Sequence, residues 1–142
     1  MSKLLSKSEE ENLVEAIAKA ESSTSGEIRV HIEKKCEGDA VQRAIAVFEQ
    51  LGMTNTEKKN GVLFYLASDS KKFAVIGDDG INKIVGKQFW DSTKEILRKH
   101  FVKGEFYKGL ELSIAEIGKQ LKTHFPYHKD DTNELPNDIS FG

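Results

Sequence analysis

The chain has 142 residues, of which 38% are hydrophobic and 31% are charged, and its formal net charge is −2. This length suits one compact domain, and the composition is that of an ordinary soluble protein. The charge gives no support to nucleic-acid binding, which usually depends on a basic surface. We therefore expect one globular domain with no nucleic-acid partner.

The N-terminal stretch "MSKLLSKSEEENL" lacks an apolar segment of signal-peptide length, and no apolar run approaches the length of a membrane span. Cys36 is the only cysteine, so an intrachain disulfide cannot form, and no partner motif indicates a catalytic thiol. We predict a protein without a membrane span and with a cytoplasmic location.

The first third of the chain predicts a helix and then a strand. Ser8 and Glu11 form a capping-box pattern at the start of an apolar helical face that extends to about Glu21. Residues 27–35, "EIRVHIEKK", alternate between apolar and polar side chains, which indicates a strand with one well-buried face. His31 lies on the polar face, where we expect an exposed or half-covered side chain and not a metal ligand.

Residues 39–67 complete a strand–helix–strand unit. Asp39 and the apolar spacing after it predict a helix over 39–52. The continuous apolar run at 62–67 is typical of a strand covered on both faces. A second apolar strand at 73–77 follows a short turn, which permits only an antiparallel hairpin.

Two helices are predicted after the hairpin. The first lies within residues 81–104 and ends at Gly104. The second spans residues 106–125 and carries a regular apolar stripe, with Gly109 and Gly118 inside it, for which close helix packing is the simplest explanation.

The element order is therefore α-β-α-β-β-α-α, which predicts a three-layer α/β/α sandwich around a small mixed β-sheet. We assign residues 1–125 to this single domain and residues 126–142 to an acidic C-terminal tail. Four apolar residues could dock the tail on the domain: Leu135, Pro136, Ile139 and Phe141.

Strand direction brings several oxygen-bearing residues to one edge of the predicted sheet. A right-handed crossover makes strands 27–35 and 62–67 parallel, and the hairpin reverses strand 73–77. The same edge then collects Glu27, Asn60, Asp78 and Asp79. Carboxylate, amide and backbone carbonyl oxygens are ligands for Ca²⁺. Asp79 could instead cap the helix that follows, with Asp78 exposed to solvent.

The C-terminal tail contains a second acidic cluster, in which Asp130 and Asp131 are the first candidate ligands. The segment "DDTNELPND" resembles an EF-hand loop in composition only, because it lacks the glycine required by the sharp turn of that loop. A docked tail would bring these carboxylates to a cation site, whereas a disordered acidic tail would not.

Four segments occur in the order found in the TPM-domain family: "SSTSGEIRVHI", "NGVLFYLA", "KFAVIGDDGI" and "GKQFW". The chain resembles this family over about residues 5–125, and in particular a short, soluble bacterial form that ends in an acidic tail. The resemblance implies an α/β/α sandwich with a divalent-cation site at the acidic loops, Ca²⁺ being the usual ion. It also implies the acid phosphatase activity of a plant relative.

Two functions remain open. The first is a small cation-binding domain that acts as an interaction or repair-assisting module for an unknown protein partner. The second is a metal-dependent acid phosphatase, in which Ca²⁺ or Mg²⁺ would polarise a phosphoryl oxygen or activate water. The family's site maps onto Glu27, Asn60, Asp78 and Asp79, and no catalytic residue can be named from the sequence.

Overall fold

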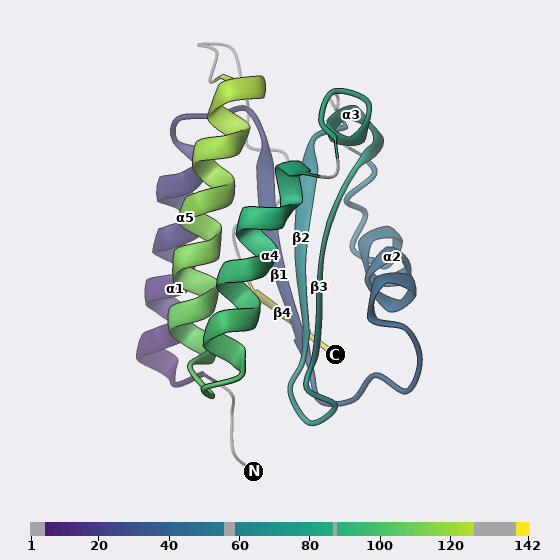
Figure 1. The fold of residues 1–142 in the computed structure, drawn as a ribbon, viewed down its shortest axis with the longest axis vertical. Helices are drawn as coiled ribbons and strands as arrows, with labels where there is room; N and C mark the ends of the chain where they lie inside the picture. The colour runs from purple at the N-terminus through teal and green to yellow at the C-terminus, as the bar shows by residue number, and fades with distance from the viewer. Residues whose placement is uncertain (1–4, 56–58, 87, 127–138) are drawn as a thin grey trace.

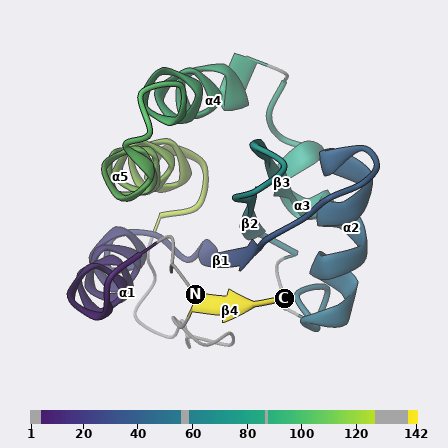
Figure 2. The same ribbon diagram turned by 90° about the horizontal axis from the view of Figure 1, so that it is seen from below.

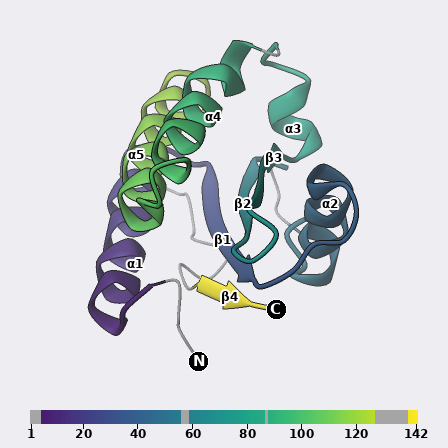
Figure 3. The same cartoon turned by 60° about the horizontal axis from the view of Figure 1, so that its bottom comes forward.

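The computed structural model describes residues 5–55, 59–86, 88–126 and 139–142 and contains a mixed four-stranded sheet between two layers of helices. Helices α1, α4 and α5 cover one face of the sheet, and α2 covers the other (Figures 1, 2 and 3). The elements in chain order are α1 (Lys7–Glu21), β1 (Glu27–Glu33), α2 (Ala40–Gln50), β2 (Gly61–Ala67), β3 (Lys72–Gly77), α3 (Asp79–Asn82), α4 (Gln88–Phe101), α5 (Phe106–His124) and β4 (Ile139–Phe141). The predicted sandwich and its element order are confirmed, and a short helix, α3, and a fourth strand, β4, are added to them.

Helix α1 begins two residues earlier than the sequence predicted. The Ser6 hydroxyl accepts a hydrogen bond from the Glu9 amide at 3.1 Å, and the Glu9 carboxylate accepts one from the Ser6 amide at 2.9 Å. The predicted capping box of Ser8 and Glu11 is therefore wrong, because both residues lie inside the helix. The pair Ser6 and Glu9 and the pair Ser8 and Glu11 both have the spacing of a capping box. With the helix starting at the first pair, Leu5 lies immediately before the cap and is buried in the core.

Three strands have the predicted directions. Strands β1 and β2 are parallel, and β2 and β3 form an antiparallel hairpin. Helix α2 makes the crossover between β1 and β2, and its N-cap Asp39 accepts a hydrogen bond from the Gln42 amide at 3.1 Å. The start of β1, the start of β2 and the end of β3 consequently lie at one edge of the sheet.

Strand β4 completes the sheet beyond β1, giving the order β3-β2-β1-β4 (Figure 2). It pairs in parallel with β1, and its Ile139 is buried in the core whereas Phe141 is 58% exposed. The sequence predicted that apolar residues of the segment 126–142 could dock on the domain, but it did not predict a strand there. Leu135 and Pro136 lie outside the described residues.

Strand β2 separates two hydrophobic cores. None of its residues from Val62 to Ala67 is more than 1% exposed, which confirms the predicted strand covered on both faces. Alternate side chains enter the core beneath α1, α4 and α5, and the others pack against α2.

The glycines of α5 lie where neighbouring helices approach it closely. A Cβ atom on Gly118 would lie 2.9 Å from the Cβ of Ala20 in α1, and one on Gly109 would lie 3.0 Å from the Cβ of His100 in α4. The close helix packing inferred from the sequence is confirmed.

Gly77 ends β3 directly beneath the indole ring of Trp90. A Cβ atom at this position would lie 2.6 Å from two carbons of the ring, which is closer than such atoms can approach. Trp90 belongs to α4 and is only 9% exposed, so the ring has little room to move. The glycine therefore lets α4 pack on the end of β3.

We predict that Gly77→Ala lowers the free energy of unfolding by about 1–3 kcal/mol, because the added methyl overpacks the contact with Trp90. Urea denaturation followed by tryptophan fluorescence measures this change. Gly86→Ala is the matched control, since a Cβ atom there has no neighbour within 4 Å. Equal stabilities of the two variants would contradict the proposed packing constraint.

The side chain of Glu21, the last residue of α1, accepts a backbone hydrogen bond at the start of β1 that a neighbouring strand would otherwise accept. Its Oε2 accepts a hydrogen bond from the Ile28 amide at 2.7 Å, on the side of β1 away from β2. Its Oε1 is buried and has no hydrogen-bond partner among the described residues. Burial raises the pKa of Glu21 from 4.5 to about 7, the Ile28 hydrogen bond opposes this shift, and the nearby Glu27 charge adds to it.

This pKa shift makes the stability of the fold dependent on pH. Between pH 4.5 and about 7 the folded protein holds a proton that the unfolded chain has lost, so the free energy of unfolding falls as the pH rises through this window. Glu21→Gln keeps an oxygen acceptor for Ile28 and carries no charge. We expect this variant to lack the decrease in the free energy of unfolding with rising pH, which amounts to up to roughly 3 kcal/mol.

Urea unfolding at a series of pH values tests this expectation. The control is Glu11→Gln, which exchanges an exposed carboxylate of the same helix. An unchanged pH slope in Glu21→Gln would show that this carboxyl is not the source of the dependence.

Candidate functional site

The backbone at the start of β1, the start of β2 and the end of β3 converges as the strand directions require. The Glu27 amide donates to the Asn60 carbonyl oxygen at 3.3 Å, and the Asp78 amide donates to the Gly61 carbonyl oxygen at 3.0 Å. Glu27, Gly61 and Asp78 therefore form one row across the sheet. This row contains two of the predicted ligands.

The side chains of the predicted ligands do not all meet. Asn60 precedes Gly61, so its side chain leaves the sheet on the opposite face from Glu27, and its amide nitrogen donates to the Ser25 carbonyl oxygen at 3.1 Å. A Cβ atom on Gly61 would contact the terminal methyl of Met53 at 3.6 Å. Met53 thus covers the middle of the row, between Glu27 and Asp78.

Asp78 is the buried member of the aspartate pair. It is the N-cap of α3, and its Oδ1 accepts a hydrogen bond from the Asp79 amide at 2.8 Å. Its Oδ2 is buried and has no hydrogen-bond partner among the described residues. The alternative in which Asp79 caps the helix and Asp78 is exposed is wrong, because Asp79 is the exposed residue.

A cleft of about 490 Å³ opens beside these aspartates, between α2 and the N-terminal half of α4. Its polar lining comes from four elements or loops and consists of Glu49, Thr54, Asp78, Asp79, Asn82 and Lys94. Glu27 and Asn60 are not among the residues that line it. Across the described ranges, no three His, Cys, Asp or Glu side chains are arranged as a ready-made metal site.

Glu49 and Thr54 were not predicted as site residues. Nothing in their local sequence distinguishes them from other polar residues at the end of a helix. They reach the cleft because the α2 crossover returns the chain beside the end of β3. Only the tertiary arrangement could have identified them.

Other residues considered from the sequence fall outside this arrangement. Asp130 and Asp131 lie outside the described residues, so their role as ligands stays a prediction.

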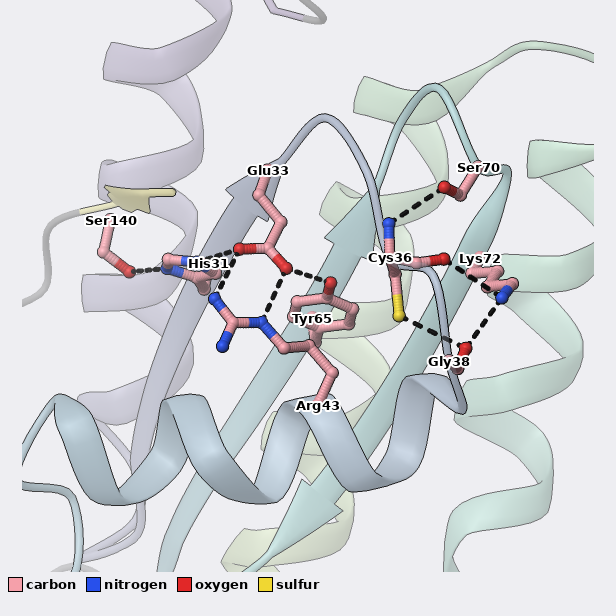
Figure 4. Close-up of polar contacts among 9 residues, drawn as sticks. All are labelled: His31, Glu33, Cys36, Gly38, Arg43, Tyr65, Ser70, Lys72 and Ser140. Atoms are coloured by element: carbon pink, nitrogen blue, oxygen red, sulfur yellow. Dashed lines mark hydrogen bonds and ion pairs between the residues drawn. The ribbon is translucent and has the colours of Figure 1, made fainter.

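A second polar cluster lies toward the other end of β1, on the face covered by α2 (Figure 4). The Glu33 carboxylate accepts hydrogen bonds from Nε and Nη2 of Arg43, both at 2.9 Å, and a third from the Tyr65 hydroxyl. His31 Nε2 lies 3.3 Å from Glu33 Oε1, and its Nδ1 lies 2.8 Å from the Ser140 hydroxyl of β4. The cluster thus joins β1, β2, α2 and β4.

In this cluster the negative charge of Glu33 is paired with the positive charge of Arg43. The two Arg43 hydrogen bonds, with those from Tyr65 and His31, hold the pKa of Glu33 at about 2 against the opposing effect of burial. Burial lowers the pKa of His31. The expectation of an exposed or half-covered His31 is wrong, since this side chain is buried beneath α2 and bridged to β4.

Cys36 lies beside this cluster in the connection between β1 and α2. Its thiol is buried and lies 3.4 Å from the Gly38 carbonyl oxygen, which also accepts a hydrogen bond from Lys72 Nζ at 2.7 Å (Figure 4). These contacts hold the thiol within the connection between β1 and α2.

A family model described as the TPM domain matches residues 1–120. A solved structure of the BA42 protein, from the psychrophilic bacterium Bizionia argentinensis, is 46% identical and covers 100% of this chain and 98% of that chain, with a TM-score of 0.95. No curated protein matches the sequence.

Two more distant structures share the fold alone. The N-terminal domain of the cg2496 protein from Corynebacterium glutamicum is 14% identical, with a TM-score of 0.67, over 82% of this chain and 74% of that chain. The N-terminal domain of a P. gingivalis protein is 20% identical, with a TM-score of 0.68, over 88% of this chain and 82% of that chain.

None of the helices in the described ranges is long and apolar enough to span a bilayer. The family match and the similarity to the BA42 protein both extend over most or all of the chain. The chain belongs to the TPM-domain family.

Proposed function

We propose that this TPM domain binds a divalent cation in the cleft beside Asp78. The observation that carries the proposal is the buried Oδ2 of Asp78, a carboxylate oxygen without a hydrogen-bond partner among the described residues. An ionised carboxylate is costly to bury unless an opposite charge or hydrogen bonds compensate it. Asp79 and Glu49 line the same cleft and would add carboxylate oxygens.

Ca²⁺ fits this cleft better than Mg²⁺. The residues lining the cleft offer carboxylates, a hydroxyl and an amide from several elements, without a compact set of preformed ligands. Ca²⁺ accepts six to eight oxygens in irregular geometry and readily includes carbonyls and waters, whereas Mg²⁺ requires a near-ideal octahedron. Glu27 and Asn60 would then support the edge of the site from the backbone instead of coordinating the ion.

The role we propose for the bound ion is to stabilise an interaction or repair-assisting module that acts on a protein partner in the cytoplasm. The ion would neutralise the adjacent carboxylates at the end of β3 and hold α3 against the cleft. Asp130 and Asp131 remain proposed contributors from the C-terminal segment.

We predict that addition of Ca²⁺ shifts the amide NMR signals of residues 78–81 and of Glu49. Asp78→Asn should weaken binding by at least about tenfold, because affinity in such sites depends on the number of carboxylates. Asparagine is also a good N-cap residue, so this substitution preserves the start of α3. Glu49→Gln should weaken binding if this side chain is a ligand.

Asp69→Asn is the control, since it removes an exposed carboxylate from the turn at the far end of β3. Binding in this variant should equal that of the unmodified chain. A spectrum that does not change at millimolar Ca²⁺ or Mg²⁺, or one that changes only at residues remote from the cleft, would reject the site.

Lys94 favours the phosphatase as a second candidate, because it lines the same cleft as the aspartates and its ammonium group could bind phosphate oxygens. Metal-dependent hydrolysis of p-nitrophenyl phosphate should then be lost in Asp78→Asn and strongly reduced in Lys94→Ala. Lys71→Ala, at an exposed turn, should have no effect. Activity that persists in Asp78→Asn would not belong to this cleft.

A further inference from the structure

Strand β4 is held on β1 by a small set of contacts. It has three residues, Ile139–Phe141, and it is the outer strand on the opposite edge of the sheet from β3. The Gly142 amide, directly after the strand, donates to the Ile32 carbonyl oxygen at 2.9 Å. Ile139 is buried in the core, whereas Phe141 is exposed. So short a strand buries little apolar surface and depends on each of its polar contacts.

Ser140 makes the polar side-chain contacts of β4. Its hydroxyl lies 2.8 Å from Nδ1 of His31 (Figure 4) and 3.3 Å from the Val30 carbonyl oxygen. The other ring nitrogen, Nε2, lies 3.3 Å from Oε1 of Glu33. An ionised carboxylate only accepts hydrogen bonds, so the hydrogen of the neutral ring is on Nε2. Nδ1 is then the acceptor to which the Ser140 hydroxyl donates.

The end of β4 also covers the ring of His31. A Cβ atom on Gly142 would collide with Oε1 of Glu33 and lie 2.8 Å from Nε2 of His31, so the Gly142 main chain packs directly on both groups. The ring also stacks against Tyr65 of β2, with the ring centroids 6.1 Å apart. Release of β4 would therefore expose the ring edge of His31 to water.

A proton on His31 has no unshared counter-ion while β4 is docked. The ion pairs of His31 and Arg43 among the described residues are both with Glu33, and Arg43 already binds both oxygens of this carboxylate. Arg43, from α2, and Arg29, on the same face of β1, carry positive charges that oppose a further cation. The docked cluster therefore accommodates a neutral His31.

The remaining groups around the ring come from β2 and β4. The Tyr65 hydroxyl donates to Glu33 and is uncharged. From the β4 side the groups are the Ser140 hydroxyl and the main chain of Gly142 with its carboxylate. Burial is the largest influence on His31 and lowers its pKa from 6.5, against the opposing effect of Glu33.

This arrangement makes the docking of β4 dependent on pH. When β4 leaves, water reaches the ring of His31 and relieves its burial, so the released form binds a proton more tightly than the docked form. Docking is then fully stable above pH 6.5, the ordinary pKa of the ring, and weakens as the pH falls below this value. One proton changes the docking equilibrium by at most about tenfold per pH unit.

We propose that β4 is an acid-released strap, which closes the outer edge of β1 while His31 is neutral and leaves this edge when His31 is protonated. Release uncovers main-chain groups of β1, among them the Ile32 carbonyl oxygen to which Gly142 donates. The strap is independent of the proposed cation site, because it lies on the opposite edge of the sheet from β3, the strand that Asp78 follows.

The test follows β4 and His31 separately by NMR, in the full chain with EDTA, from about pH 8 to about pH 5. The ¹⁵N NOE of the Gly142 amide measures the docked fraction, and the ¹³Cε1 shift of His31 measures its protonation. We expect the NOE to fall on acidification with the same midpoint as the His31 titration. The sign separates this release from the effect of Glu21, whose protonation stabilises the fold as the pH falls.

Two variants and a control extend the test. His31→Gln keeps a polar side chain for Ser140 but does not titrate, so β4 should stay docked throughout. Ser140→Ala removes the hydroxyl and should raise the released fraction at about pH 8 by roughly three- to tenfold, the effect of one hydrogen bond. His100→Gln should leave the profile unchanged, since His100 is also buried and paired with a glutamate, Glu105, but lies in α4.

Three outcomes would overturn the proposal: a Gly142 NOE that stays constant while His31 titrates, a release whose midpoint differs from that of His31, or the same acid release in His31→Gln. If His31→Gln releases β4 at every pH, the comparison of the two midpoints in the unmodified chain decides alone.

Discussion

The buried carboxylate of Glu33 is the contact on which the arrangement of the layers depends. It lies at the end of the central strand β1, and it receives hydrogen bonds from α2 through Arg43 and from β2 through Tyr65. Through His31, the same cluster reaches Ser140 on β4. A buried charge is tolerated only when it is paired and hydrogen-bonded. The cluster satisfies this requirement and thereby positions α2, one face of which forms a wall of the cleft.

Each end of the sheet contains a buried carboxylate, and the two carboxylates differ in how their charge is compensated. At Glu33, four donor groups from three neighbouring side chains surround the carboxylate, and its pKa of about 2 reflects this. At Asp78, one carboxylate oxygen caps α3 and the other has no partner among the described residues. The first arrangement is complete within the protein, whereas the second leaves a buried carboxylate oxygen that the proposed cation would compensate. Of these two carboxylates, only Asp78 therefore has an oxygen left to bind a cation.

The sequence predicted the parts of this fold that depend on local pattern and strand direction. The alternation in β1, the apolar run of β2 and the hairpin to β3 fixed three strands and hence the edge that carries Asp78. Strand β4 escaped prediction because three residues provide almost no periodicity, and only pairing with β1 defines them. The relative burial of Asp78 and Asp79, and the presence of Glu49 in the cleft, depend on how α2 and α3 pack. No spacing rule contains that information.

The pairing of β4 with β1 also affects the order in which the structure forms. The contact between His31 and Ser140 joins residues 109 positions apart, whereas the β2–β3 hairpin forms between near neighbours. The entropy of closing a loop grows only slowly with its length, so a brief outer strand is weak mainly because it forms few contacts. We expect such a strand to join after the rest of the sheet and to separate from it before global unfolding. We therefore expect the opening free energy of β4 to be lower than that of the three strands β1 to β3.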